Sequence, residues 1–146
     1  MSETYIVRDY MMSALTTISK DSSLLDAAMT MRRSSIRHLP IVDGDRLVGI
    51  ITERDVLRCS PSLLSEITQD EYNAIFENTP IARVMTRDPT SVQPDAPIRD
   101  AVALMMDRKM GCLPVVENGR LVGILTRSDL LNVLMNLLPS PPASAA

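Results

Sequence analysis

The apolar and polar positions of this chain follow one pattern twice. Residues 47–55 read LVGIITERD and residues 121–129 read LVGILTRSD, so the two copies lie 74 positions apart. Each copy is an apolar, strand-like segment that contains a glycine and continues into Thr-x-x-Asp. Because an internal repeat determines the architecture, this offset organises the interpretation of the whole chain.

One amphipathic helix is predicted ahead of the apolar segment in each copy. Ser23, followed by Asp26, resembles a capping box and marks the start of the first helix. In the second copy Asp95 is the expected N-cap, and Pro97 suits the first turn. Apolar residues recur at i, i+3, i+4 and i+7, which places one apolar stripe on each helix: Leu24, Ala27, Ala28 and Met31, then Ile98, Ala101, Val102 and Met105.

A strand, a turn and a second strand are predicted after each helix. Short extended segments at 16–18 and 90–92 precede the helices, and Thr52 and Thr126 each open a final helix. The strand, turn and strand fall at 39–42, 43–45 and 46–51, and again at 113–116, 117–119 and 120–125. Each copy is therefore β-α-β-β-α. Neither copy alone buries much surface, so we expect an α/β protein whose two pseudo-symmetric repeats pack through their sheets around a cleft.

The repeat divides the chain into four segments. The residues between the copies are acidic with interspersed apolar positions, which predicts a connecting helix. The last residues are Pro, Ser and Ala, which cannot build a packed element, so we expect a mobile tail. The predicted segments are repeat 1 at 7–60, the connecting segment at 61–80, repeat 2 at 81–138 and the tail at 139–146.

Composition argues against two classes of partner. A net charge of −3 and an aromatic content of 3% provide neither the basic face nor the stacking platform that nucleic-acid binding needs. No apolar run approaches the roughly 20 residues that span a bilayer, so no membrane partner is expected and a cytoplasmic location is the prediction.

Metal, disulfide and catalytic chemistry are not expected either. Cys59 and Cys112 are isolated, with no CxxC motif, which favours buried, reduced thiols over a disulfide. His38 is the single histidine and forms no recognised metal-ligand spacing with them. The chain also lacks a Gly-x-x-x-x-Gly-Lys loop and a Gly-x-Ser-x-Gly elbow, so we predict no enzyme activity and no catalytic residues.

The Thr-x-x-Asp motifs have two interpretations. Thr126 with Asp129, and Thr52 with Asp55, can be capping boxes, and the pattern alone favours that interpretation. Alternatively, the carboxylate can accept hydrogen bonds from the vicinal hydroxyls of a ribose. The threonine hydroxyl, beside a helix N-terminus, can then contact a phosphate. The glycines within the repeated segments either admit a close backbone approach or relieve crowding in a strand.

The whole pattern resembles a known family. Leu-Pro-Ile-Val before the turn and Leu-Val-Gly-Ile-Ile-Thr-x-x-Asp after it resemble the CBS domain, and two copies in tandem resemble a CBS pair, or Bateman module. The resemblance implies an adenosine-type ligand (AMP, ADP, ATP or S-adenosylmethionine), with no cofactor required, and a homodimer formed through the repeat helices. No attached effector domain is expected, so the chain resembles stand-alone CBS pairs. This resemblance implies that a separate, unknown effector protein is its partner.

By resemblance, each site draws on both repeats. The first site would hold the adenine against backbone of the first repeat and the ribose on Asp129, using Thr16, Thr17, Ile18, Ile36, Arg37, His38, Ile124, Thr126, Arg127 and Asp129. The second, pseudo-symmetric site would use Ile50, Thr52, Arg54, Asp55, Thr90, Val92, Met110, Gly111 and Cys112. Glu53 occupies the position of Arg127 and would repel phosphates, so the first site is favoured. His38 is more often a partly exposed strand residue than a ligand contact, and Cys112 more often a core thiol.

The prediction is therefore a regulatory module that senses an adenosine ligand and signals to a partner protein through rearrangement of the pair. The alternative is a ligand-free dimerisation or docking module in which the Thr-x-x-Asp motifs only cap helices. The sequence does not distinguish among the adenosine ligands, nor between one filled site and two.

Overall fold

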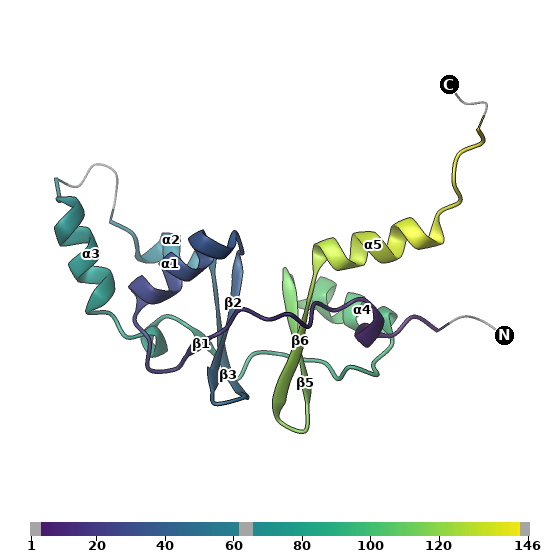
Figure 1. Cartoon of the computed structure of the whole chain (residues 1–146), viewed down its shortest axis with the longest axis horizontal. Helices are drawn as coiled ribbons and strands as arrows, with labels where there is room; N and C mark the ends of the chain where they lie inside the picture. Colours follow the sequence, from purple (N-terminus) through teal and green to yellow (C-terminus); the bar gives the residue numbers. More distant parts are fainter. Residues whose placement is uncertain (1–3, 62–65, 144–146) are drawn as a thin grey trace. The chain divides into compact units, whose positions relative to one another are not determined.

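A computed structural model describes residues 4–61 and 66–143 of the chain. These residues form five α-helices and six strands, which confirms the predicted α/β class (Figure 1). The chain divides into two compact units. The first-repeat unit comprises residues 15–90 and 118–121; the second-repeat unit comprises the described residues up to 14, 91–117 and those from 122 onward.

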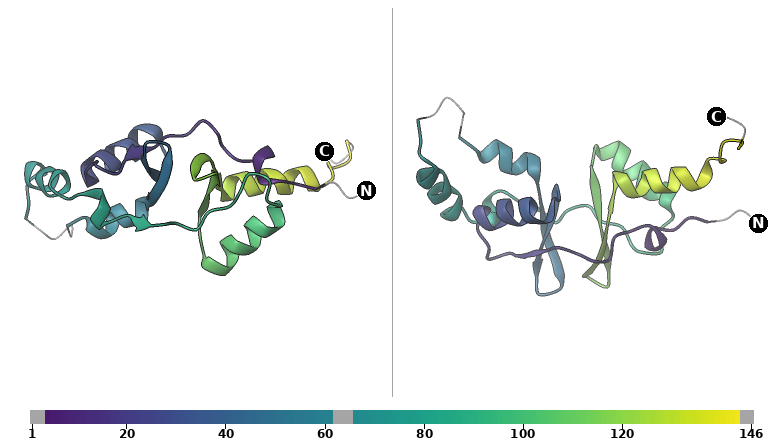
Figure 2. Two further views of the ribbon diagram at one scale, coloured as in Figure 1. Left: turned by 90° about the horizontal axis from the view of Figure 1, so that it is seen from below. Right: turned by 45° about the horizontal axis from the view of Figure 1, so that its top comes forward.

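In the first-repeat unit, a small sheet carries helices on one side. Strand β1 pairs in parallel with β2, whereas β2 and β4 pair antiparallel with β3. The elements are β1 (Ile18–Ser19), α1 (Leu24–Ser34), β2 (His38–Asp43), β3 (Arg46–Thr52), α2 (Glu53–Cys59), α3 (Gln69–Glu77), the 3-10 turn η2 (Ile81–Arg83) and β4 (Thr86–Arg87). Figure 2 shows α1 and α2 on the same face of the β2–β3 hairpin.

Helix α1 confirms the predicted capping box. The Ser23 Oγ accepts a hydrogen bond from the Asp26 backbone N–H at 3.2 Å, and Asp26 Oδ2 accepts from the Ser23 N–H at 3.0 Å. The helix ends where Ser35 adopts a left-handed conformation with φ 52°. The predicted stripe points into the core, because Leu24, Ala27 and Met31 are buried.

In the second-repeat unit, the order helix, strand, strand, helix recurs, as the 74-residue offset predicts. Its elements are the 3-10 turn η1 (Val7–Asp9), α4 (Ile98–Arg108), β5 (Cys112–Glu117), β6 (Arg120–Thr126) and α5 (Arg127–Leu137). Each unit has a core of its own. One core includes Leu39, Ile41 and Ile51, and the other includes Leu113 and Leu125.

The start of α4 differs from the prediction. Pro97, with ψ 140°, is the N-cap residue, and no side chain caps the helix. Asp95, the predicted cap, instead forms an ion pair with Arg8 at 3.2 Å. The first helical N–H, that of Ile98, donates to the carbonyl of Tyr5 at 2.8 Å. The backbone carbonyl of Tyr5 thus accepts the hydrogen bond at the helix start that the sequence pattern assigned to the Asp95 carboxylate.

The extended segments are also shorter than predicted. At 90–92 only an isolated bridge forms, between Val92 and Val115, with the Val92 N–H donating to Pro114 at 3.0 Å. The regular pairing lies earlier, in β4. At 16–18 only Ile18 belongs to β1.

Each unit is completed by the segment that precedes the other repeat in sequence. Ser23 bridges Pro80 in the first-repeat unit, and Pro97 bridges Ile6 in the second-repeat unit. The corresponding N–H of Leu24 donates to Thr79 at 2.8 Å, as that of Ile98 does to Tyr5. Neither sequence repeat therefore contains all the backbone partners of its own helix.

The connecting segment contains the predicted helix, which is α3. Its Phe76 is fully buried against α1 and stacks on Tyr72, with ring centroids 4.5 Å apart. Residues 62–65 of the segment lie outside the described chain. Of the predicted tail, residues 139–143 form neither helix nor strand, and its mobility stays a prediction.

Candidate functional site

The two Thr-x-x-Asp motifs adopt the same local geometry at the strand-to-helix junctions. In the first-repeat unit, Asp55 Oδ2 accepts from the Thr52 backbone N–H at 2.9 Å and from its hydroxyl at 3.0 Å. In the second-repeat unit, Asp129 Oδ2 accepts from the Thr126 N–H at 2.7 Å and from its hydroxyl at 3.1 Å. Both motifs are capping boxes.

The cap uses only part of each carboxylate. All four of these hydrogen bonds end on Oδ2, so the capping box itself does not occupy Oδ1. Asp55 and Asp129 are half-buried, so each residue keeps some exposed surface. A carboxylate has about four acceptor positions, and capping a helix therefore does not prevent the same residue from accepting hydrogen bonds from a ligand.

In the first-repeat unit, the segment 36–38 lies beside the first motif. His38 pairs with Thr52 in the β2–β3 ladder, and the carbonyl of Arg37 accepts from the Glu53 N–H at 2.9 Å. The Arg37 side chain also forms an ion pair with Glu53 at 3.7 Å, although the two side chains are 83% and 58% exposed. Such an exposed pair contributes little to stability.

The second-repeat unit repeats this neighbourhood. The Arg127 N–H donates to the carbonyl of Gly111 at 3.3 Å, so the segment 110–112 lies beside the second motif. Arg127 is the first residue of α5 and is exposed, as is Arg54 on α2. Both arginines thus stand at helix N-termini, where the backbone also favours an anion.

The remaining predicted site residues fall on the strands and the segments leading into them. Ile50 and Ile124 sit in β3 and β6 and are each 7% exposed. The backbone of Ile124 exchanges two hydrogen bonds with Met12, at 2.9 and 3.0 Å, and Ile50 pairs with Thr86. The other residues are half-buried: Thr16, Thr17, Ile18, Thr90, Val92 and Met110.

The predicted sites each join residues of both units. Thr126 and Asp129 belong to the second-repeat unit, whereas segments 16–18 and 36–38 belong to the first-repeat unit. Their assignment to one ligand site stays a prediction. Within each unit, the structure brings the Thr-x-x-Asp motif together with one predicted segment of the same repeat. This segment is 36–38 in the first-repeat unit and 110–112 in the second-repeat unit.

The sequence did not reveal the neighbours of the glycines in the two repeated segments. Met85 covers Gly49 and Met11 covers Gly123, in the first- and second-repeat units respectively. The sequence signal that could have predicted these contacts is the spacing of the two methionines, which lie 74 positions apart like the glycines that they cover. Both interpretations have a supporting contact at Gly49, where the Met85 side chain and the Thr86 backbone carbonyl oxygen lie nearest. At Gly123 the nearest atoms all belong to the Met11 side chain, which supports relief of crowding.

The two cysteines differ in burial. Cys112 is buried, as predicted, and this burial raises its pKa to about 12; Cys59, predicted to be buried, is half-buried. Within residues 4–61 and 66–143, no three His, Cys, Asp or Glu side chains gather in a group that could hold a metal ion. No helix in this part of the chain has the length and apolar character to cross a bilayer.

Comparison with known proteins identifies the repeat. The family model of the CBS domain matches residues 7–62 and again residues 81–136. This chain belongs to the CBS domain family. A CBS domain-containing protein of Dictyostelium discoideum is 36% identical over 143 residues, which cover 95% of this chain and 98% of that protein.

Two solved CBS pairs are similar in structure. The plant protein CBSX2 of Arabidopsis thaliana, crystallised in complex with AMP, matches with a TM-score of 0.78 and 25% identity over 92% of this chain and 99% of its own. The CBS domain pair of protein MJ0100, in complex with 5′-methylthioadenosine and S-adenosylmethionine, matches with a TM-score of 0.76 and 27% identity, covering 93% of this chain and all of its own. The prediction of a tandem CBS pair is confirmed.

Proposed function

We propose that this CBS pair is a regulatory sensor of an adenosine-type ligand. The observation that carries the proposal is its likeness, over more than nine-tenths of the chain, to CBS pairs crystallised with AMP and with S-adenosylmethionine. The cap geometry is compatible with it, because both capping carboxylates keep an oxygen outside the cap. The proposed role is regulation rather than catalysis, and no cofactor is required.

In the favoured site, Asp129 holds the ribose and Thr126 lies near the first phosphate. Asp129 Oδ2 keeps the Thr126 N–H while Oδ1 accepts from a ribose hydroxyl. The backbone of segments 16–18 and 36–38 contacts the adenine, and Ile124 packs on the base. Arg127 supplies a guanidinium at the N-terminus of α5, where a phosphate gains from both the side chain and the helix dipole.

The pseudo-symmetric site uses Thr52 and Asp55 in the same roles. It draws its adenine contacts from Thr90, Val92 and segment 110–112, with Ile50 against the base. Glu53 takes the position of Arg127, and its ion pair with Arg37 offsets its charge only weakly because both side chains are exposed. This site therefore favours a ligand with fewer phosphates, or one with a positive charge such as S-adenosylmethionine.

Ligand binding would act by shifting the arrangement of the two units, which an effector protein then reads. A ligand can shift such an equilibrium only by the difference between its affinities for the two arrangements. Sites that take contacts from both units provide such a difference, because a change of arrangement changes the number of contacts. The second candidate function is a docking module without ligand, which the complete capping boxes favour since they account for both motifs.

The test is thermal unfolding of nucleotide-free protein with AMP, ADP, ATP, S-adenosylmethionine and NADH, each in turn at millimolar concentration. A ligand at about 100 times its Kd adds roughly 2.7 kcal/mol, which is several degrees in Tm for a chain of this size. We expect a shift with at least one adenosine ligand, and its loss in Asp129→Ala.

The chain offers a matched control in Asp26→Ala. Asp26 closes the same kind of capping box on α1 but belongs to neither proposed site. Asp26→Ala should lower Tm by the loss of a cap and keep the ligand-induced shift. If no ligand shifts the Tm of the wild-type chain, or if Asp129→Ala keeps the full shift, the proposed sensor is wrong and the docking module stands.

A further inference from the structure

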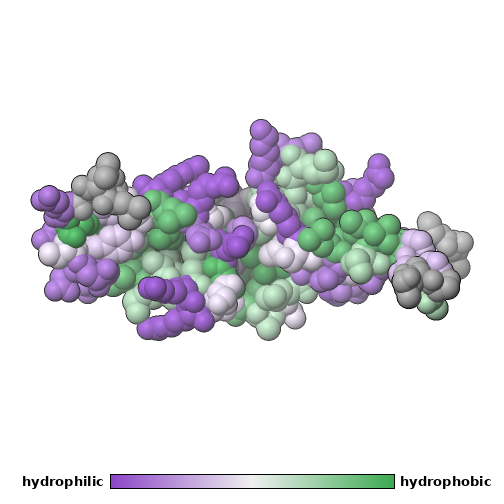
Figure 3. Space-filling model, turned by 90° about the horizontal axis from the view of Figure 1, so that it is seen from above, coloured by the Kyte–Doolittle hydropathy of each residue, from purple (hydrophilic) through white to green (hydrophobic). Residues whose placement is uncertain are grey.

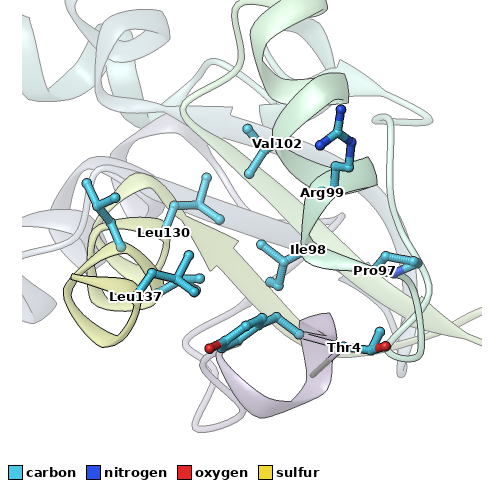
Figure 4. Close-up of a pocket in the computed structure, with 10 residues that line it drawn as sticks. Thr4, Pro97, Ile98, Arg99, Val102, Leu130 and Leu137 are labelled. Carbon is cyan, nitrogen blue, oxygen red and sulfur yellow. The ribbon is translucent and has the colours of Figure 1, made fainter. Parts of the chain in front are cut away.

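Two cavities, one within each unit, each have a volume of about 440 Å³. The cavity of the second-repeat unit lies between α4 and α5, and its wall is mostly aliphatic, with Ile98 on α4 and Leu137 on α5 (Figure 4). Figure 3 shows hydrophobic residues gathered over α5 as well. The cavity of the first-repeat unit differs in chemistry, because much of its wall is charged. Its charged lining residues are Lys20, Asp21, Arg87 and Asp88.

The second-repeat unit shows which group occupies the equivalent place there. The guanidinium of Arg8, in the 3-10 turn η1, lies 3.2 Å from a carboxylate oxygen of Asp95 and 3.7 Å from one of Glu117. The 74-residue offset relates Asp95 to Asp21 and Glu117 to Asp43. In this unit, one guanidinium therefore contacts both carboxylates.

The first-repeat unit has Ala82 in place of Arg8. The two 3-10 turns are held alike, because the residue before each position donates its N–H to the segment ahead of the helix, to Ala96 at 2.9 Å and to Ser22 at 3.1 Å. Ala82 also lines the cavity. A methyl group thus stands where the other unit has a long cationic side chain, which leaves room for the cationic group of another molecule.

The chain itself neutralises the carboxylates of the first-repeat unit only in part. Lys20 Nζ contacts Asp43 at 3.0 Å. In the described part of the chain, Asp21 and Asp88 have no Lys, Arg or His nitrogen within 4.0 Å, and Arg87 has no carboxylate oxygen within this distance. These two cations and three carboxylates together leave a net charge of −1.

We propose that this cavity binds a small amino acid of the arginine type, with a guanidinium at the end of an aliphatic side chain. Its guanidinium takes the place of the Arg8 side chain, beside Asp21. Its carboxylate pairs with the guanidinium of Arg87, and its α-ammonium pairs with Asp88, the next residue in the chain. Such a ligand has a net charge of +1, which complements the −1 of the charged residues around the cavity.

The uncharged part of the wall suits the aliphatic portion of this ligand. Val48 and Met85 line the cavity beside Ala82, and both are half-buried against the first-repeat core. The methylene groups of arginine pack along apolar surface of this kind, while the charged head stays in contact with water. The volume of about 440 Å³ also lies within the range of about 300–1,000 Å³ that is typical of small-molecule sites.

The cavity is separate from the proposed adenosine sites. None of the residues that line it belongs to either of those sites. Asp21 and Asp88 also repel a phosphate, so the wall disfavours a nucleotide. The inference does not depend on the proposed adenosine sensor, because it concerns a different ligand at a different place.

NMR titration of the isotopically labelled full chain tests the proposal, with L-arginine and L-citrulline as probes. L-Citrulline has the shape of L-arginine, but a neutral urea group replaces the guanidinium. We expect L-arginine to move the backbone amide signals of residues 20–21 and 87–88. Its Kd should be lower than that of L-citrulline by about tenfold or more, since only the guanidinium forms a charge-assisted hydrogen bond with Asp21.

Two variants of the cavity and one matched control complete the test. Asp21→Asn removes the anion, and Ala82→Arg supplies the guanidinium from the chain itself, so each should raise the Kd of L-arginine about tenfold or more. Asp95→Asn is the control, since Asp95 is the equivalent aspartate of the second-repeat unit and is already paired with Arg8. It should leave the Kd unchanged, and the amide spectra check that all three variants fold.

Arg87→Gln tests the orientation of the ligand. It should weaken the binding of L-arginine and leave that of agmatine, which lacks the carboxylate, unchanged. Wild-type amide signals that do not move with L-arginine, equal Kd values for L-arginine and L-citrulline, or equal effects of Asp21→Asn and Asp95→Asn would overturn the proposal.

Discussion

The side chain of Met85 lies directly over the backbone of Gly49. A Cβ built on this glycine would come within 2.5 Å of the methionine Sδ and 3.1 Å of the Thr86 carbonyl oxygen. Strand β4, which contains Thr86, thus approaches β3 at a position where only a hydrogen atom fits. The contact joins the first residues of the second repeat to the first-repeat unit.

Gly49→Ala should therefore destabilise the fold by overpacking, by about 1–3 kcal/mol. Its φ is not positive, so backbone strain adds nothing to this cost. The double variant Gly49→Ala with Met85→Ala should recover part of the loss, because the added methyl then meets a smaller neighbour. Urea unfolding of the four chains of this cycle measures the coupling. If the cost of the double variant equals the sum of the two single-variant costs, Met85 does not occupy the space over Gly49.

Arg127→Ala should weaken phosphate-bearing ligands and spare S-adenosylmethionine. A charge-assisted hydrogen bond to phosphate is worth about 1.5–3 kcal/mol, which corresponds to a roughly tenfold or larger increase in Kd. Isothermal titration with AMP and with S-adenosylmethionine separates the two effects. Arg58→Ala is the control, since Arg58 is an exposed arginine in the last turn of α2 and belongs to neither proposed site. Equal losses for both ligands would contradict the role proposed for Arg127.

Local signals predicted most of the elements correctly. The capping box at Ser23, the apolar stripe of α1 and the turn at Gly44 each depend on residues a few positions apart, and each appears in the structure. The cap of α4 could not be predicted in this way. Its first N–H is satisfied by Tyr5, which is more than 90 positions earlier in the chain, and no local pattern encodes such a partner.

The candidate site was predictable to the same degree. The Thr-x-x-Asp spacing alone predicted both capping boxes, which the hydrogen bonds confirm. The ribose role came from resemblance, because a spacing does not indicate whether the free oxygen of Asp129 meets a ligand or water. The sequence analysis missed that the first residues of each repeat pair with a strand of the other repeat, as Met12 does with Ile124 and Thr86 with Ile50. Such short extended segments have little hydrophobic periodicity of their own.

Cys112 should be inert toward thiol reagents in the folded chain. Its side chain is 3% exposed, and burial raises its pKa from 9.0 to about 12, so the reactive thiolate is scarce at pH 8. Titration with a chromogenic disulfide should detect fast reaction of Cys59 alone, and Cys59→Ser should abolish it until denaturant is added. Fast reaction of two thiols in the native wild-type chain would contradict the buried position of Cys112.

The same thiol makes stability depend on pH in the alkaline range. The unfolded chain loses this proton near pH 9.0, whereas the folded chain keeps it to about pH 12. The unfolded state therefore binds fewer protons between these values, and the contribution of Cys112 to stability falls as pH rises. Urea unfolding at pH 8 and pH 10 should show a smaller decrease for Cys112→Ala than for the wild-type chain. An identical decrease in both would mean that other groups account for the alkaline loss.

Phe76→Ala should be among the most destabilising single changes in the chain. Phe76 is fully buried in the first-repeat core, and truncation of a buried phenylalanine costs about 3–5 kcal/mol through lost burial and the cavity left behind. Ile75, its neighbour on α3, is 47% exposed and serves as the control, because Ile75→Ala should cost much less. Urea unfolding followed by far-ultraviolet circular dichroism measures both. A cost of Phe76→Ala no larger than that of Ile75→Ala would contradict the buried position of Phe76.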